Sequence, residues 1–132
     1  MRTVNLDEAI QLVRDAVALK GEDYVYEPPK DDLYGGPTCL YAFDGKPSCI
    51  VGHVFAALGV PIKPMEYGEN SEEKGIYSFG VAGDVADRLE HDELVGFTIA
   101  AKDFLRVVQR KQDEFYTWSD ALQAGLAAIP AV

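Results

Sequence analysis

Cysteine and histidine at four-residue spacing are the side chains of this sequence best suited to chemistry. Cys49 and His53 fall in a segment, Cys49 to Leu58, whose apolar content and flanking residues predict a helix. At this spacing both side chains lie on one face of the helix. Cys49 is in the first turn, where unpaired backbone N–H groups and the helix dipole favour a thiolate. The pattern is therefore compatible with a Cys–His pair for nucleophilic catalysis.

The same two residues also fit a structural role. Cysteine is among the residues most often buried, and a histidine on an apolar helix is usually a core group bonded to a backbone carbonyl. Known thiol enzymes usually bring the histidine from a distant segment, and the other histidine of this sequence is His91. We therefore expect Cys49 and His53 to lie in the core, with a cysteine-dependent enzyme as the alternative.

Zinc binding is a further alternative, because Cys39, Cys49, His53 and His91 together have the side chains of a Cys2His2 site. Nine residues separate the two cysteines, however, whereas the paired cysteines of a zinc site are usually about two to four apart. The sequence has no phosphate-loop, dinucleotide-binding or EF-hand motif. We expect no cofactor, and a small structural zinc protein remains the third hypothesis.

Acidic residues give the sequence a formal net charge of −10. Binding to nucleic acid or to an anionic membrane requires an excess of Lys and Arg, so we expect neither. The excess of acids is concentrated between Glu66 and Glu93, which we call the acidic segment. Its nine acids, against the two bases Lys74 and Arg88, are Glu66, Glu69, Glu72, Glu73, Asp84, Asp87, Glu90, Asp92 and Glu93.

Two interpretations of the acidic segment stay open. It could imitate a phosphate array and occupy a basic groove on a partner protein. The favoured interpretation is a solvated face, neutralised in part by the basic stripe Lys102, Arg106 and Arg110.

Tyrosines gather near the first loops, at Tyr24, Tyr26, Tyr34 and Tyr41. Tyrosine is enriched where proteins meet partners, so residues 24–43 are a candidate contact surface. The alternative is a half-buried two-stranded sheet whose outer face carries the rings.

Four helices are predicted from apolar residues at three- and four-residue spacing, at about residues 5–20, 49–58, 98–114 and 118–128. A weaker helical pattern lies near residues 84–90. Polar residues that precede the four helices are predicted N-caps, and they are Asn5, Ser48, Thr98 and Thr117. Glu8 completes a capping-box pattern with Asn5. Phe115 is placed on the apolar side of the third helix.

Strand predictions fall between the helices. Tyr24–Tyr26 and Thr38–Phe43 are expected to be short strands, the second closed by a turn at Asp44–Gly45. Residues 62–75 are expected to be an exposed loop, and residues 76–81 a short strand or extended segment.

These elements predict an α+β fold, a single mostly helical domain over residues 1–132. About four helices are expected around residues 48–58, with a two- or three-stranded sheet on one side. No stretch has the roughly 18 apolar residues needed to span a bilayer, and the start lacks the apolar core of a signal peptide. Two cysteines are too few for a disulfide framework, so we expect a cytoplasmic protein, although a single bridge between Cys39 and Cys49 stays open as an alternative.

Two segments carry a resemblance. Gly45-Lys46-Pro47-Ser48-Cys49-Ile50-Val51-Gly52-His53 and Thr117-Trp118-Ser119-Asp120-Ala121-Leu122 resemble small uncharacterised proteins of actinobacterial phages and their hosts, in which a Pro-Ser-Cys helix precedes a helical tail. The resemblance implies a phage or prophage accessory protein in a bacterial cytoplasm.

The leading functional hypothesis is a non-enzymatic interaction module that binds a protein of the host through its acidic or tyrosine-rich surface. The identity of the partner and the oligomeric state stay open.

Overall fold

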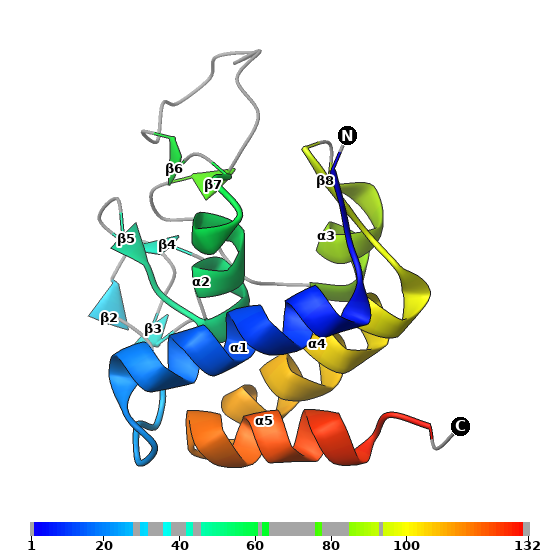
Figure 1. Ribbon diagram of the computed structural model, residues 1–132. Helices are drawn as coiled ribbons and strands as arrows, with labels where there is room; N and C mark the ends of the chain where they lie inside the picture. The colour runs from blue at the N-terminus through cyan, green and yellow to red at the C-terminus, as the bar shows by residue number, and fades with distance from the viewer. Residues whose placement is uncertain are drawn as a thin grey trace.

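The computed structural model describes residues 2–27, 30–31, 36–37, 42–43, 46–60, 62–63, 76–77, 85–92 and 94–130. Within these ranges the chain has a mostly helical α+β fold (Figure 1), which confirms the predicted fold class. Its helices are α1 (Leu6–Lys20), α2 (Ile50–Ala57), α3 (Val85–His91), α4 (Ile99–Asp113) and α5 (Trp118–Ala127). The weak helical pattern near residues 84–90 is thus confirmed as α3.

A parallel pair of strands that the sequence did not predict joins the two halves of the chain. Strand β1 (Arg2–Val4) pairs with β8 (Val95–Phe97), with Val4 opposite Phe97. The N–H of Thr98 continues the pairing by donating to the carbonyl of Val4 at 3.0 Å. Because each strand has three residues and ends directly at a helix, this pair fixes where α1 and α4 begin relative to each other.

The other described strands are two-residue pairs. Antiparallel pairing joins β2 (Lys30–Asp31) to β3 (Gly36–Pro37) and β4 (Ala42–Phe43) to β5 (Lys46–Pro47), and parallel pairing joins β6 (Ile62–Lys63) to β7 (Ile76–Tyr77).

Two strand and loop predictions change, and a third is met in its described part. Tyr24–Tyr26 is not a strand, because its pairing is limited to one isolated bridge between Val25 and Thr117. The expected exposed loop at 62–75 begins with a strand, β6, and its other residues lie outside the described ones. Of the predicted strand Thr38–Phe43, the described part is β4, and the turn residues Asp44–Gly45 are outside.

The predicted caps of α1, α4 and α5 are confirmed. The Asn5 side chain accepts from the N–H of Glu8 at 2.9 Å, and Thr98 accepts from Ala101 at 3.2 Å. The Thr117 hydroxyl accepts from the N–H of Asp120 at 3.0 Å. These bonds join neighbours in sequence, which is why the sequence pattern could predict them.

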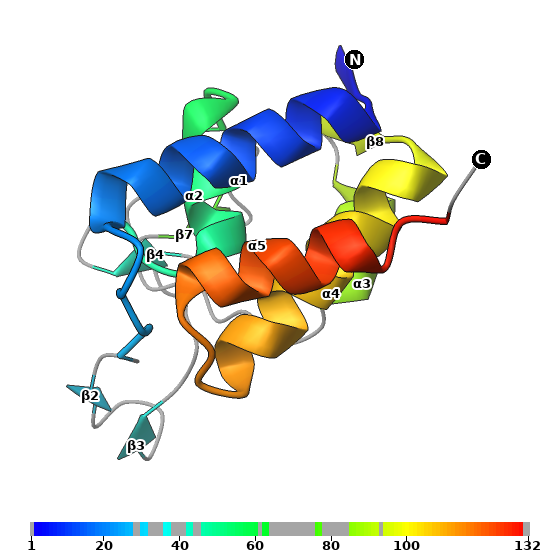
Figure 2. The ribbon, with the colours of Figure 1, turned by 60° about the horizontal axis from the view of Figure 1, so that its bottom comes forward.

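Helices α4 and α5 form an antiparallel hairpin, and α1 packs against both (Figure 2). Gly125 lets α5 approach α4 closely, since a Cβ at that position would lie 2.5 Å from Cγ2 of Val108 and 2.9 Å from Cε1 of Phe104. The hairpin turn corrects one prediction. Phe115 is 70% exposed instead of lying on the apolar face. Its φ of 68° turns the chain out of α4 in the left-handed conformation that usually requires glycine.

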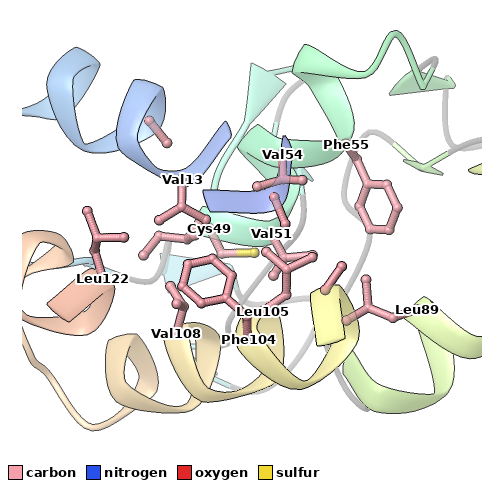
Figure 3. Packing of buried hydrophobic residues seen from close by; sticks show 14 of the residues in the cluster. Val13, Cys49, Val51, Val54, Phe55, Leu89, Phe104, Leu105, Val108 and Leu122 are labelled. Atoms are coloured by element: carbon pink, nitrogen blue, oxygen red, sulfur yellow. The ribbon is translucent and has the colours of Figure 1, made fainter. Parts of the chain in front are cut away.

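The core surrounds α2. Figure 3 shows Val51, Val54 and Phe55 of α2 between side chains of the other helices. Those partners come from α1, α3, α4 and α5 and include Val13, Leu89, Phe104, Leu105 and Leu122. Ile50, Val51, Val54 and Phe55 have no exposed surface, so this helix lies at the centre of the described fold.

Candidate functional site

The N-cap of α2 is Cys49, not Ser48 as predicted. The Cys49 sulfur accepts from the N–H of Gly52 at 3.4 Å. Serine is ordinarily the better cap, but the Ser48 hydroxyl is hydrogen-bonded to the Tyr26 hydroxyl at 2.8 Å. A contact with a residue 22 positions away in sequence therefore moves the cap by one residue.

Two buried glutamines of α4 complete the N-terminus of α2. The N–H of Ile50 donates to Oε1 of Gln112 at 2.9 Å, and that of Val51 donates to Oε1 of Gln109 at 3.3 Å. The glutamines are three residues apart and so share one face of α4. Together with Cys49 they satisfy the first backbone donors of the helix, which leaves these groups unavailable to an anion. Sequence reasoning missed Gln109 and Gln112, although both fall on the apolar face of α4.

Cys49 has no exposed surface in this arrangement. A nucleophile must reach its substrate, and a buried sulfur that accepts a backbone hydrogen bond is enclosed on all sides. The geometry agrees with the favoured interpretation of Cys49 as a core residue and gives no support to the enzyme alternative.

His53 lies on the same helix, is half-buried and packs against an aromatic ring. Its ring meets Trp118 edge-on, with 5.4 Å between centroids, and Trp118 meets Tyr24 in the same manner at 4.8 Å. Burial, and to a smaller degree the charge of Lys20, lower the pKa of His53 to about 4. A general base acting near neutral pH needs a higher pKa than this. His53 is therefore a neutral packing group.

One expectation for His53 is not met. Its Nε2 is buried with no hydrogen-bond partner among the described residues, and the same is true of Nε1 of Trp118. The favoured carbonyl bond is thus absent at Nε2. Burying a ring nitrogen without a partner costs more free energy when the ring is charged than when it is neutral, which agrees with the lowered pKa of His53.

The proposed zinc ligands are not brought together among the residues that the structure describes. His91 is exposed at the end of α3, whereas Cys49 is buried and His53 is half-buried on α2, and Cys39 lies outside the described ranges. In those ranges, no group of three or more His, Cys, Asp or Glu residues is arranged to hold a metal ion.

Two acids of the acidic segment are described in full, and both are engaged within the molecule. Asp92 pairs with Arg88 at 2.9 Å and accepts from the N–H of Val95 at 2.8 Å, so it is a buried cap at the start of β8. Glu90 pairs with Lys102, whose hydrogen bond and charge lower the pKa of Glu90.

Asp92 therefore corrects the predicted contact surface, and Glu90 agrees with neutralisation by the basic stripe. Asp87 lies on α3, without a described side chain. The remaining acids lie outside the described residues, namely Glu66, Glu69, Glu72, Glu73, Asp84 and Glu93.

The predicted tyrosine contact surface is wrong at Tyr26, and the ring of Tyr24 contacts another part of the same molecule. Tyr26 is buried. Tyr24 is half-buried against Trp118, and its carbonyl accepts from the N–H of Trp118 at 2.8 Å. Both rings stabilise the start of α5 and the cap region of α2 instead of facing a partner. Tyr34 and Tyr41 lie outside the described residues.

An apolar groove that sequence reasoning did not predict lies where the start of α1, the start of α4 and the end of α5 meet. These three helix ends lie on the same side of the molecule, near the C-terminus (Figure 2). The groove, called here the α1/α4/α5 groove, has a volume of about 400 Å³. Its lining consists of Leu6, Ile99, Ala100, Asp103, Phe104, Val107, Gly125, Ala128, Ile129 and Pro130.

The groove is open to solvent and carries little charge. Ile99 is 74% exposed at its rim, and Asp103 alone is charged among the described residues that line it. Ile99, Asp103 and Val107 follow each other at four-residue intervals and so form one stripe along α4, beside the buried face. That stripe was the available sequence signal, but the other two walls come from distant segments.

Comparisons with known proteins find no relative of this chain. No protein-family model matches the chain, and neither a curated protein nor a solved structure matches it. Among the described helices, none has the length and apolar content to cross a membrane.

Proposed function

We propose that this chain is a non-enzymatic protein-interaction module that binds its partner in the α1/α4/α5 groove. The observation that carries the proposal is an open, apolar groove of about 400 Å³ with Ile99 74% exposed at its rim. Apolar side chains gathered around a surface hollow are typical of a site that another molecule covers. Full burial of Ile99 alone would contribute about 1.5–3 kcal/mol.

The walls of the groove are preformed by the packing of the helix hairpin. Phe104 is buried behind the groove, and Gly125 brings the α5 backbone against Phe104 and Val108. A wall held in this way needs little ordering when a partner binds, so more of the contact energy remains for affinity. This rigidity supports a binding role for the groove.

The chemistry of the lining supports binding over catalysis. Among the described lining residues, Asp103 has the one charged side chain, and none is a thiol, a hydroxyl or an imidazole. Cys49 is buried and His53 is half-buried, and neither residue of this candidate catalytic pair lines the groove. The resemblance of the Pro47-Ser48-Cys49 segment to actinobacterial phage proteins supports a search for the partner in such a host.

The test compares two single substitutions that remove equally exposed aliphatic side chains. Ile99→Ser changes the groove rim, and Leu19→Ser changes the far end of α1, where Leu19 is 72% exposed. Immobilised wild-type protein and both variants are incubated with lysate of an actinobacterial host, and the captured protein is quantified.

We expect Ile99→Ser to lower the captured amount by at least about tenfold and Leu19→Ser to leave it unchanged. Equal capture by Ile99→Ser and wild type, or no specific capture by wild type, would refute the groove as the contact site. Thermal unfolding of both variants confirms that they fold.

A further inference from the structure

We infer that the occupant of the α1/α4/α5 groove is a short amphipathic helix of a partner protein, with a basic side chain between two aliphatic ones. The inference rests on the proposed function and names the class of segment that the groove accepts. It comes from the sign of the charge in the groove and from the spacing of the stripe on α4.

Asp103 gives the groove a negative charge. Its side chain is 66% exposed, and its nearest cation is Arg106, with 3.6 Å between Nη1 and Oδ1. An exposed pair at this distance on one helix contributes little, so Asp103 can accept a better-placed base. A Lys or Arg of the partner, desolvated by the surrounding apolar walls, would form a stronger pair than Arg106 does.

The helix ends at the groove do not reverse that sign. The start of α4 has no acidic residue in its first turn, so it presents a partial positive charge. The end of α5 has no basic residue in its last turn, so it presents a partial negative charge of similar size. The start of α1 also presents a partial positive charge, but Asp7 and Glu8 in its first turn offset it. The helix ends therefore do not reverse the negative charge of Asp103. The formal charge of −10 adds a long-range attraction for a basic segment.

The stripe on α4 determines the pattern of the occupant. Ile99, Asp103 and Val107 span two helical turns, which is about 12 Å along the axis. A helix lying along this stripe faces an aliphatic residue, then a carboxylate, then an aliphatic residue. Its complement carries Leu or Ile, then Lys or Arg, then Leu or Ile, also at four-residue intervals, which is recognition of a helix in a groove.

A second copy of this chain fits the groove less well. The groove carries one acidic side chain and would pair with a basic one. If two copies joined groove to groove, neither could supply that base, because the described lining contains no Lys or Arg. Two chains of charge −10 also repel each other. The charge therefore favours a different, basic partner.

The experiment measures the binding of three fluorescein-labelled peptides by fluorescence anisotropy. Each peptide is a helix-forming sequence of about 15 residues. The first carries Leu, Arg and Leu at four-residue spacing, the second has Glu in place of Arg, and the third has Ala in place of both Leu. They are titrated with wild-type protein and with Asp103→Lys. Asp15→Lys is the control, because Asp15 is an exposed acid on the solvent side of α1.

Binding of the Leu-Arg-Leu peptide at least about tenfold tighter than either other peptide, lost in Asp103→Lys and kept in Asp15→Lys, supports the inference. Ala100→Trp, which fills the groove from an exposed position, should abolish this binding. Its fold is checked by circular dichroism.

Three results overturn the inference. Equal binding of the Arg and Glu peptides shows that the groove binds aliphatic segments whatever the sign of their charge, and the proposed function would still hold. A wild-type dimer in sedimentation that Ala100→Trp converts to a monomer makes a second copy the occupant. Binding of no peptide removes the inference, and the Ile99→Ser capture then decides separately whether the proposed function survives.

Discussion

Protonation of His53 should destabilise the fold at mildly acidic pH. In the folded protein its half-buried ring packs against Trp118, and burial together with Lys20 lowers the pKa of His53 to about 4. In the unfolded chain its pKa returns to about 6.5. Between these values the unfolded chain binds the proton and the folded protein does not. The stability that is present above about pH 6.5 is therefore lost as the pH falls toward 4.

The size of the effect follows from the two pKa values. A difference of this size corresponds to about 3 kcal/mol when both states are fully titrated. At pH 5 most of the unfolded chains and few of the folded ones are protonated, which reduces the figure to about 2 kcal/mol. Solvent around the exposed part of the ring screens the charge further. We therefore expect a loss of about 1–2 kcal/mol between about pH 7.5 and pH 5.

Urea unfolding of wild type and His53→Gln at both pH values isolates this effect, because the carboxylates of the two proteins titrate alike. The substitution removes packing on Trp118 equally at both pH values, so the informative quantity is the change in the stability difference. We expect the advantage of wild type to shrink by about 1–2 kcal/mol at the lower pH. A stability difference independent of pH would show that His53 titrates as an exposed histidine and would refute the argument.

Gln112→Ala should destabilise the protein by about 1–3 kcal/mol in urea unfolding, because the buried N–H of Ile50 loses its acceptor. Gln11→Ala, which removes an exposed side-chain pair on α1, should change stability by less than about 0.5 kcal/mol, and equal losses in the two variants would contradict the capping role. In a Cys39→Ser background, Cys49 should react with iodoacetamide at least about tenfold more slowly in the folded protein than in denaturant. Fast reaction of the folded protein would instead support the cysteine-dependent enzyme.

What the sequence could predict was local. The caps at Asn5, Thr98 and Thr117 each join residues three positions apart, so the pattern of one segment contains both partners. The cap of α2 differs because Tyr26, from another segment, takes the Ser48 hydroxyl. The sequence pattern of one segment does not show that a residue of another segment will bond to its cap residue.

The remaining differences come from contacts between distant segments. Arg2 pairs with Val95, and no alternation of three residues could identify either strand or join them. The α1/α4/α5 groove likewise combines residues near positions 6, 99 and 129. The stripe on α4 was present in the sequence, but an exposed Ile99 is unremarkable until the other walls are known.

The capping of α2 by Gln109 and Gln112 has a consequence for the order of folding. An eight-residue helix is too short to persist alone in water, and two of its first donors find their acceptors 58 and 62 positions later. The most buried helix is therefore not expected to be stable before the helices around it have formed. We expect α2 to become stable only once α4 is in place, because a chain that stops before residue 109 lacks both glutamine acceptors of its central helix.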